Sequence, residues 1–274
     1  MLRPGYVLPA RGSRGEHPSE RALAPAFLTF TGLIIAWQLA TSLYEIPNWL
    51  LPSPYRIASA LWEWRFELVR DVGVTLLETI IGFAVALIVA MPIAAALVSS
   101  SLFWRAFYPL LAGVQSIPKN AIAPILILWF GTGQLSKVAI AFLISFFPIV
   151  INAVSGMQAT DSDAMAMFKS LRASRLQILL HLRLPNALPF IFAAAKVSIT
   201  LALVGAVIGE FVGADSGLGY VILLSSSQLH TDLAFAAIAL LAVIGMALFS
   251  AVGIVERLVT PWAPQVESML GYRA

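Results

Sequence analysis

Long apolar segments separated by short polar connections dominate the pattern of this chain. A helix that crosses a bilayer needs about 20 mostly apolar residues, and six segments reach roughly that length. They cover residues 25–43, 73–98, 107–130, 137–156, 187–212 and 233–256. Prolines and polar residues interrupt the third segment, at Pro118, Lys119, Asn120 and Pro124. The pattern predicts an all-α integral membrane protein with six transmembrane helices.

The composition excludes several other classes of protein. Hydrophobic residues make up 59% of the 274 residues and charged residues only 11%, against roughly 25% charged residues in a soluble domain. There is no cysteine, and the three histidines are scattered, so we expect no disulfide, thiol chemistry or bound metal. The cations that give the net charge of +3 do not gather on one patch, so we expect no nucleic-acid partner.

The distribution of lysine and arginine among the connections predicts the orientation of the chain. With the N-terminus inside, eleven cations fall on the cytoplasmic side and four (Arg56, Arg65, Arg70 and Lys137) on the other. Because cytoplasmic loops carry the excess of positive charge, we expect both termini in the cytoplasm. Residues 1–24 and 263–274 then form cytoplasmic tails, the first of them flexible, around a transmembrane domain at 25–262.

The first outer connection, residues 44–72, contains an amphipathic stretch from Tyr55 to Val69. Its tryptophans, with Trp49 just before it, suit a helix that rests at the depth of the lipid headgroups. A helix packed against the other spans explains the same pattern equally well.

The longest cytoplasmic connection, residues 157–186, has the signals of two short helices. Asp161 offers an N-cap for a helix through about Leu171, and Ser174 can cap a second helix that Pro185 closes. The first helix places Met165, Phe168 and Leu171 along one face, an arrangement that fits an apolar anchor for a partner's groove. Alternatively, the cations of this loop only fix the topology or contact anionic lipid.

Ionisable residues inside the apolar segments also need a structural or functional explanation, because they are costly at membrane depth. Lys119 can line a solute path together with Gln115, Ser116 and Asn120, or it can cap free carbonyls or pair with Glu210 or Glu78. Lys196 and Glu210 are candidates for the same path. They stand 14 residues apart, about 21 Å along a continuous helix, so they cannot pair with each other. Gly205 and Gly209 predict close helix packing, within one subunit or between two.

The loop at 157–186 resembles the cytoplasmic signature of permease subunits of binding-protein-dependent ABC importers. That signature reads Glu-Ala-Ala, three residues, Gly, nine residues, Ile, one residue and Leu-Pro. Leu184–Pro185 matches its end, which places Leu182 at the Ile, Arg172 at the Gly and Ala166–Met167–Phe168 at the Glu-Ala-Ala. The spacing is kept, while the Glu and the Gly are missing.

Four further blocks resemble the nitrate, sulfonate and taurine branch of these importers, in the same order and spacing. The blocks read LPSPYRIASALWE, TLLETIIGFAVALIVAMPIAAAL, SIPKNAIAPILILWFGTG and GEFVGADSGLGYVI. The resemblance covers about residues 50–262. Within the branch, the surroundings of Lys119 and Lys196 are most similar to importers of pyrimidine-type vitamin precursors or flavins.

The resemblance implies a type I importer permease fold, with a pair of coupling helices between spans four and five that fits a cleft on a cytoplasmic ATPase. It implies these coupling residues: Ala166, Met167, Phe168, Lys169, Ser170, Leu171, Arg172, Ala173, Ser174, Leu184 and Pro185. It implies a permease homodimer, an extracytoplasmic solute-binding protein and contact with lipid. The chain has no phosphate-binding loop of the Gly-x-x-x-x-Gly-Lys type, so we expect ATP and Mg²⁺ in the partner and no cofactor here.

Two other functions are compatible with six spans. A stand-alone carrier driven by an ion gradient is the main alternative, although no inverted repeat is evident in the sequence. A membrane-embedded enzyme is less consistent with the sequence, because no nucleophile–base set or His/Asp/Glu cluster falls at membrane depth.

Overall fold

The computed structural model describes residues 20–115 and 117–262, with side chains for all of these except 20–26, 111–112, 114–115 and 119–120. This part of the chain is helical and contains no strand. Its elements are α1 (Glu20–Leu43), α2 (Pro54–Glu63), α3 (Arg65–Ser99), α4 (Ser101–Gln115), α5 (Lys119–Phe130), α6 (Gln134–Gln158), α7 (Ser162–Ser170), α8 (Arg175–Ile178), the π-helical turn η1 (Leu179–Arg183), α9 (Leu184–Gly213), α10 (Leu218–Ser227) and α11 (Thr231–Val259).

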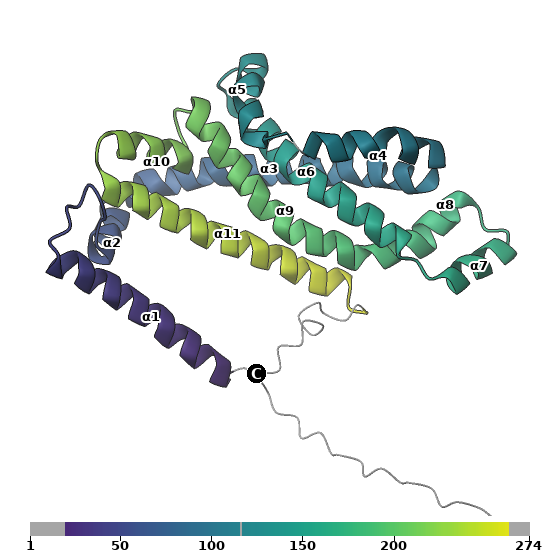
Figure 1. Ribbon diagram of the computed structural model, residues 1–274, viewed down its shortest axis with the longest axis horizontal. Coiled ribbons are helices and arrows are strands. Elements are labelled where there is room, and N and C mark those ends of the chain that lie inside the picture. The colour runs from purple at the N-terminus through teal and green to yellow at the C-terminus, as the bar shows by residue number, and fades with distance from the viewer. Residues whose placement is uncertain (1–19, 116, 263–274) are drawn as a thin grey trace, which may run out of the picture.

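The long helices α3, α6, α9 and α11 run along the long axis of the molecule (Figure 1). α10 and α2 lie at one end, called here the α10 end, and α7 and α8 project from the other, the α7 end. Four segments of the described chain are long and apolar enough to cross a membrane: Arg65–Ser99, Gln134–Gln158, Arg175–Gly213 and Thr231–Val259. These confirm four of the six predicted spans as long apolar helices, and the apolar parts at Phe27–Leu43 and Ala121–Phe130 are shorter.

The third predicted span is not one helix, because α4 ends at Gln115 and α5 begins at Lys119. Pro118 is the N-cap of α5 and has extended backbone angles. A proline lacks the N–H that a helix interior needs and disfavours helical geometry in the residue before it. The break between the two helices follows directly from this residue.

Small residues set the spacing between α6 and its neighbours. Gly205 of α9 approaches Ala141 of α6 so closely that an added Cβ would lie 2.7 Å from the Cα of Ala141. Gly209 approaches Lys137 of α6 in the same way, at 2.9 Å from its Cγ. The predicted glycine pair therefore packs inside one subunit rather than between two.

The amphipathic stretch divides at Trp64, where α2 ends and α3 begins. In α2, Ile57 and Ala60 are buried against Ala236 of α11, whereas Trp62 is exposed. The packing alternative therefore holds for one face of this helix, which is shorter than the predicted stretch.

Candidate functional site

The first candidate site is the segment at the α7 end, residues 161–186. Asp161 caps α7, because its Oδ2 accepts a hydrogen bond of 3.0 Å from the N–H of Ala164, as predicted. The helix ends in a Schellman motif, in which the N–H of Ala173 donates to the carbonyl of Phe168 and the N–H of Arg172 to the carbonyl of Lys169, both at 3.0 Å. Two short helices joined by a tight turn are thus confirmed.

Arg172 occupies the position of this turn that usually belongs to glycine. Its φ of 55° lies in the left-handed region, which is unfavourable for residues other than glycine and asparagine. The turn therefore keeps the backbone geometry that a glycine would give, although the residue is an arginine. Arg172 is exposed, so its long side chain meets no steric obstacle.

The second short helix is capped as predicted but does not end at Pro185. Ser174 and Gln177 form a reciprocal capping box, with hydrogen bonds of 3.2 and 2.7 Å. The helix then continues through η1 into α9, so the predicted stop at Pro185 is wrong. In the π-helical turn the N–H of Leu184 bonds to Leu179, five residues back. This wider turn carries the helix into Pro185, which sits in the first turn of α9 where its missing N–H costs little.

Apolar side chains of this segment are exposed on the isolated chain. Leu171 is 72% exposed, Leu176 62% and Met167 53%. Phe168 and Met165, predicted on the same face as Leu171, are only partly exposed. Met167, Leu171 and Leu176 therefore form an exposed apolar surface at this projecting end, called here the coupling surface.

Two side chains attach this segment firmly to the long helices. Arg183 donates from Nη1 to the carbonyl of Val98 at 2.9 Å, and Asn186 donates from Nδ2 to the carbonyl of Gly156 at 3.0 Å. Both acceptors belong to the last turns of α3 and α6, whose carbonyls have no partner within their own helix. The α7–α8 segment is therefore bonded to α3 and α6 and is continuous with α9.

The second candidate site lies at the α10 end, where a loop is held by acidic and hydroxyl groups. Three successive N–H groups each meet a side chain: that of Gly217 donates to Asp71, that of Leu218 to Thr75 and that of Gly219 to Glu210. Thr75 in turn donates to Glu210 at 2.7 Å. These six residues form what is called here the outer polar cluster, together with the buried Glu78 and Lys137, which are 1% and 3% exposed.

Lys137 was expected in an outer connection, but its side chain is buried in α6 and donates to the carbonyl of Thr132 at 2.8 Å. Lys196 forms an ion pair of 2.7 Å with Glu256 of α11. The sequence analysis did not single out Glu256, because this residue stands at the last position of the sixth predicted span. The signal that could have identified it is a carboxylate inside an otherwise apolar segment.

The four residues predicted to line the solute path at the break in the third span cannot be compared with the structure. The side chains of Gln115, Lys119 and Asn120 lie outside the described part of the chain, and Ser116 lies outside it entirely.

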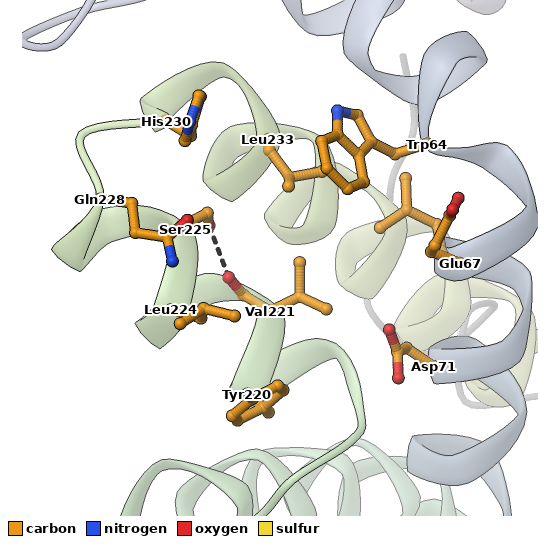
Figure 2. Close-up of a pocket in the computed structure, with 11 residues that line it drawn as sticks. Trp64, Glu67, Asp71, Tyr220, Val221, Leu224, Ser225, Gln228, His230 and Leu233 are labelled. Carbon is orange, nitrogen blue, oxygen red and sulfur yellow. Dashed lines mark hydrogen bonds between the residues drawn. The ribbon is translucent and has the colours of Figure 1, made fainter.

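A cavity of about 220 Å³ opens beside the outer polar cluster. Figure 2 shows Asp71 and Glu67 of α3 on one side, Trp64 at the junction of α2 and α3, and Tyr220 of α10 opposite. Aromatic rings and carboxylates in one cavity suit a small polar group with an apolar body or the side chain of a docked protein. Sequence reasoning did not identify this cavity, whose walls come from three separate segments.

Together these features define a polytopic helical membrane protein with an exposed apolar surface at one end and a polar cluster at the other. Residues 82–261 match the family described as the inner membrane component of binding-protein-dependent transport systems, and the chain belongs to that family. It is thus a permease subunit of an ABC importer for small solutes, integral to the inner membrane. Such subunits are not catalytic, and ATP and Mg²⁺ act in a separate ATPase partner.

Relatives and solved structures agree with this assignment. The chain is 34% identical over 250 residues to the formylaminopyrimidine transport permease protein ThiX of Halalkalibacterium halodurans, covering 89% of this chain and 97% of that one. It is 36% identical over 242 residues to the riboflavin transport system permease protein RibX of Chloroflexus aurantiacus, covering 86% and 88%. An inward-facing structure of the MetNI methionine ABC transporter matches with a TM-score of 0.64 at 19% identity, covering 72% of this chain and 98% of that one. The type I permease fold and the predicted branch are thereby confirmed.

Proposed function

We propose that two copies of this chain form the membrane pathway of an ATP-driven importer and that the α7–α8 segment of each copy docks on a cytoplasmic ATPase. The coupling surface carries this proposal. Its three exposed apolar side chains stand on a turn whose geometry is fixed by caps. Two of its members, Met167 and Leu171, belong to the residues that the family signature implies, 166–174 with Leu184 and Pro185. Closure of the ATPases would then pull on α3, α6 and α9 through Arg183 and Asn186.

The proposed topology places the α7 end in the cytoplasm and the α10 end outside. Six crossings are made by α1, α3, the interrupted α4–α5 pair, α6, α9 and α11, within a transmembrane domain at 25–262 and with cytoplasmic tails at 1–24 and 263–274. The excess of cations in the connections on the α7 side supports this orientation. The tryptophans near the α10 end support a second interface there, where the lipid headgroups would lie.

For the solute path, we infer that Gln115, Ser116, Lys119 and Asn120 line it at the break between α4 and α5. Broken helices in membranes are tolerated where they face a cavity or other protein. Lys196 and Glu210 belong to the helices of the path wall, but their charged ends are engaged by Glu256 and by the outer polar cluster. The solute class that the relatives support is an aromatic nitrogen heterocycle, captured by an extracytoplasmic binding protein.

The test of coupling is the Leu171→Asp variant, because a carboxylate on the coupling surface would be buried without a partner in the ATPase cleft. We expect it to reach the membrane normally and to lose co-purification with the co-expressed ATPase. Leu171→Met is the matched control and should retain the complex. Normal co-purification of Leu171→Asp would contradict the proposed docking surface.

Transport is tested in vesicles that contain the permease, the ATPase and the binding protein. Uptake of formylaminopyrimidine or riboflavin should require ATP and all three components. Uptake by this chain alone under an ion gradient would instead indicate a secondary carrier. Binding of neither compound by the cognate binding protein would overturn the solute class without affecting the ATP-driven mechanism.

A further inference from the structure

Glu210 is surrounded by hydrogen-bond donors. Its Oε1 accepts from the hydroxyl of Thr75 at 2.7 Å, and its Oε2 accepts from the N–H of Gly219 at 2.5 Å. Gly219 stands in the first turn of α10, where the free N–H groups and the helix dipole favour a negative charge. Glu210 is fully buried, and its surroundings are those of an ionised carboxylate.

Glu78 is buried to the same extent but has the opposite surroundings. Neither of its carboxyl oxygens has a hydrogen-bond partner among the described residues, and the side chain is 1% exposed. Thr75, whose hydroxyl donates to Glu210, lies three residues before Glu78 on the same buried face of α3, which places the carboxyl group of Glu78 beside that of Glu210. Two ionised carboxylates offer only acceptors to each other, so this contact becomes a hydrogen bond only when one of them carries a proton.

The charges around Glu78 permit one negative charge but not two. The described charged groups that act on it are Glu210 of α9 and Lys137 of α6. Asp71, about two turns away on α3, is bonded to Gly217, and α10 contributes Tyr220 but no charged residue. Lys137 balances one carboxylate. A second buried charge without a partner would strongly destabilise the folded protein.

We propose that Glu78 is a proton-binding site: it is held as a neutral carboxylic acid that donates a hydrogen bond to the ionised Glu210, so that Glu78, Glu210 and Lys137 together carry no net charge. The bound proton connects the middle of α3 to α9 and thereby to the loop that begins α10. This role is independent of the solute and of the ATPase, because it concerns only contacts within one subunit.

The test compares two isosteric variants in the purified, full-length permease. In Glu78→Gln the amide replaces the acid proton as donor to Glu210, so thermal unfolding and binding-protein-stimulated ATPase activity of the complex should match the natural protein. In Glu210→Gln an amide N–H₂ group replaces one of the two oxygens that accept from Thr75 and Gly219, so one of these hydrogen bonds is lost. This loss should lower the folded-to-unfolded ratio roughly 10- to 100-fold. A Glu78→Gln variant that fails to fold, or that is as damaged as Glu210→Gln, would overturn the proposal.

Infrared difference spectroscopy locates the proton directly. The carbonyl stretching band of a protonated carboxyl should be present at neutral pH and should disappear in Glu78→Gln. Its absence from the natural protein, or its survival in Glu78→Gln, would refute the assignment.

A double variant separates this arrangement from an ion pair between Glu78 and Lys137. Lys137→Met should destabilise the protein, and adding Glu78→Gln should not rescue it, because Glu78 carries no charge to remove. Rescue by Glu78→Gln would show that Glu78 is ionised and would contradict the proposal.

Discussion

At the α10 end, Glu210 is fully buried and both of its oxygens accept hydrogen bonds from within the chain. At the α7 end, Leu171 and Leu176 are mostly exposed, because no other described part of the chain covers them. The first region pairs the carboxylate of Glu210 with donors of the same chain, whereas the second presents apolar surface. The α7 segment nevertheless has well-formed caps at Asp161 and Ser174. The backbone geometry of the α7 segment is therefore fixed within the isolated chain, whereas its apolar side chains stay exposed.

This difference has a mechanical consequence for a transporter. If the α7 segment receives force from the ATPase, as proposed, it needs a stiff backbone and firm attachment, and the bonds of Arg183 and Asn186 to the ends of α3 and α6 supply that attachment. A region that holds helices together at the far end needs specific internal bonds. Substitutions should therefore reduce folding at the α10 end and reduce coupling at the α7 end.

The largest effect is expected for Gly217→Ala at the α10 end. Gly217 has a φ of 103°, and an added Cβ would overlap the carboxyl group of Glu210. Backbone strain and overpacking together should destabilise the protein by about 3 kcal/mol or more. The yield of monodisperse permease and its thermal unfolding midpoint measure this loss.

Gly73→Ala on α3 is the matched control, because a Cβ at that position meets nothing within 4 Å. It lies in a helix, so alanine should stabilise it by roughly 0.5–1 kcal/mol. If the two alanine variants had equal stability, the outer polar cluster would not hold the loop as described.

Arg183→Ala should have the next largest effect and should act mainly on coupling. It removes the bond to the carbonyl of Val98, a charge-assisted contact worth about 1.5–3 kcal/mol when intact. We expect the complex to assemble and hydrolyse ATP while solute uptake per ATP falls. Unchanged uptake per ATP would show that the link to α3 does not carry the movement.

Much of this architecture could be predicted from the sequence, because membrane spans and helix caps depend on local composition. Asp161 and Ser174 act as the predicted caps, and α3, α6, α9 and α11 coincide with apolar segments. Pro185 was misread because a π-helical turn, which has no strong sequence signal, carries the helix past it.

Long-range polar contacts could not be predicted in the same way. Thr75 and Glu210 are 135 residues apart, and a single sequence contains no information on which distant polar residues meet. Lys137 was assigned to a connection because it stands at the first residue of a predicted span, where a shift of a few residues separates an exposed cation from a buried one. Hydropathy alone does not resolve that boundary.

Ser174→Ala should have a smaller effect, confined to the α7 end. It removes the hydroxyl that accepts from the N–H of Gln177, which should destabilise the start of α8 by about 1 kcal/mol. ATPase affinity should fall because part of the binding energy is then used to order the helix. Amide hydrogen exchange at α8 should rise, while exchange at α10 stays unchanged; equal changes at both ends would contradict their independence.

The smallest expected effect is a gain of stability, for Arg172→Gly. Glycine adopts the left-handed conformation of this turn without the penalty that Arg172 carries, but it also raises the entropy of the unfolded chain. The net stabilisation of the turn should therefore stay below about 1 kcal/mol. It should appear as slower amide exchange at Ala173, whose N–H donates to the carbonyl of Phe168.

The Arg172→Ala variant separates the effect of backbone geometry from the effect of charge, because it removes the cation but keeps the strained backbone. If glycine and alanine changed ATPase affinity equally, the guanidinium group would contact the ATPase; if only glycine changed it, the conformation of the turn would be what limits docking.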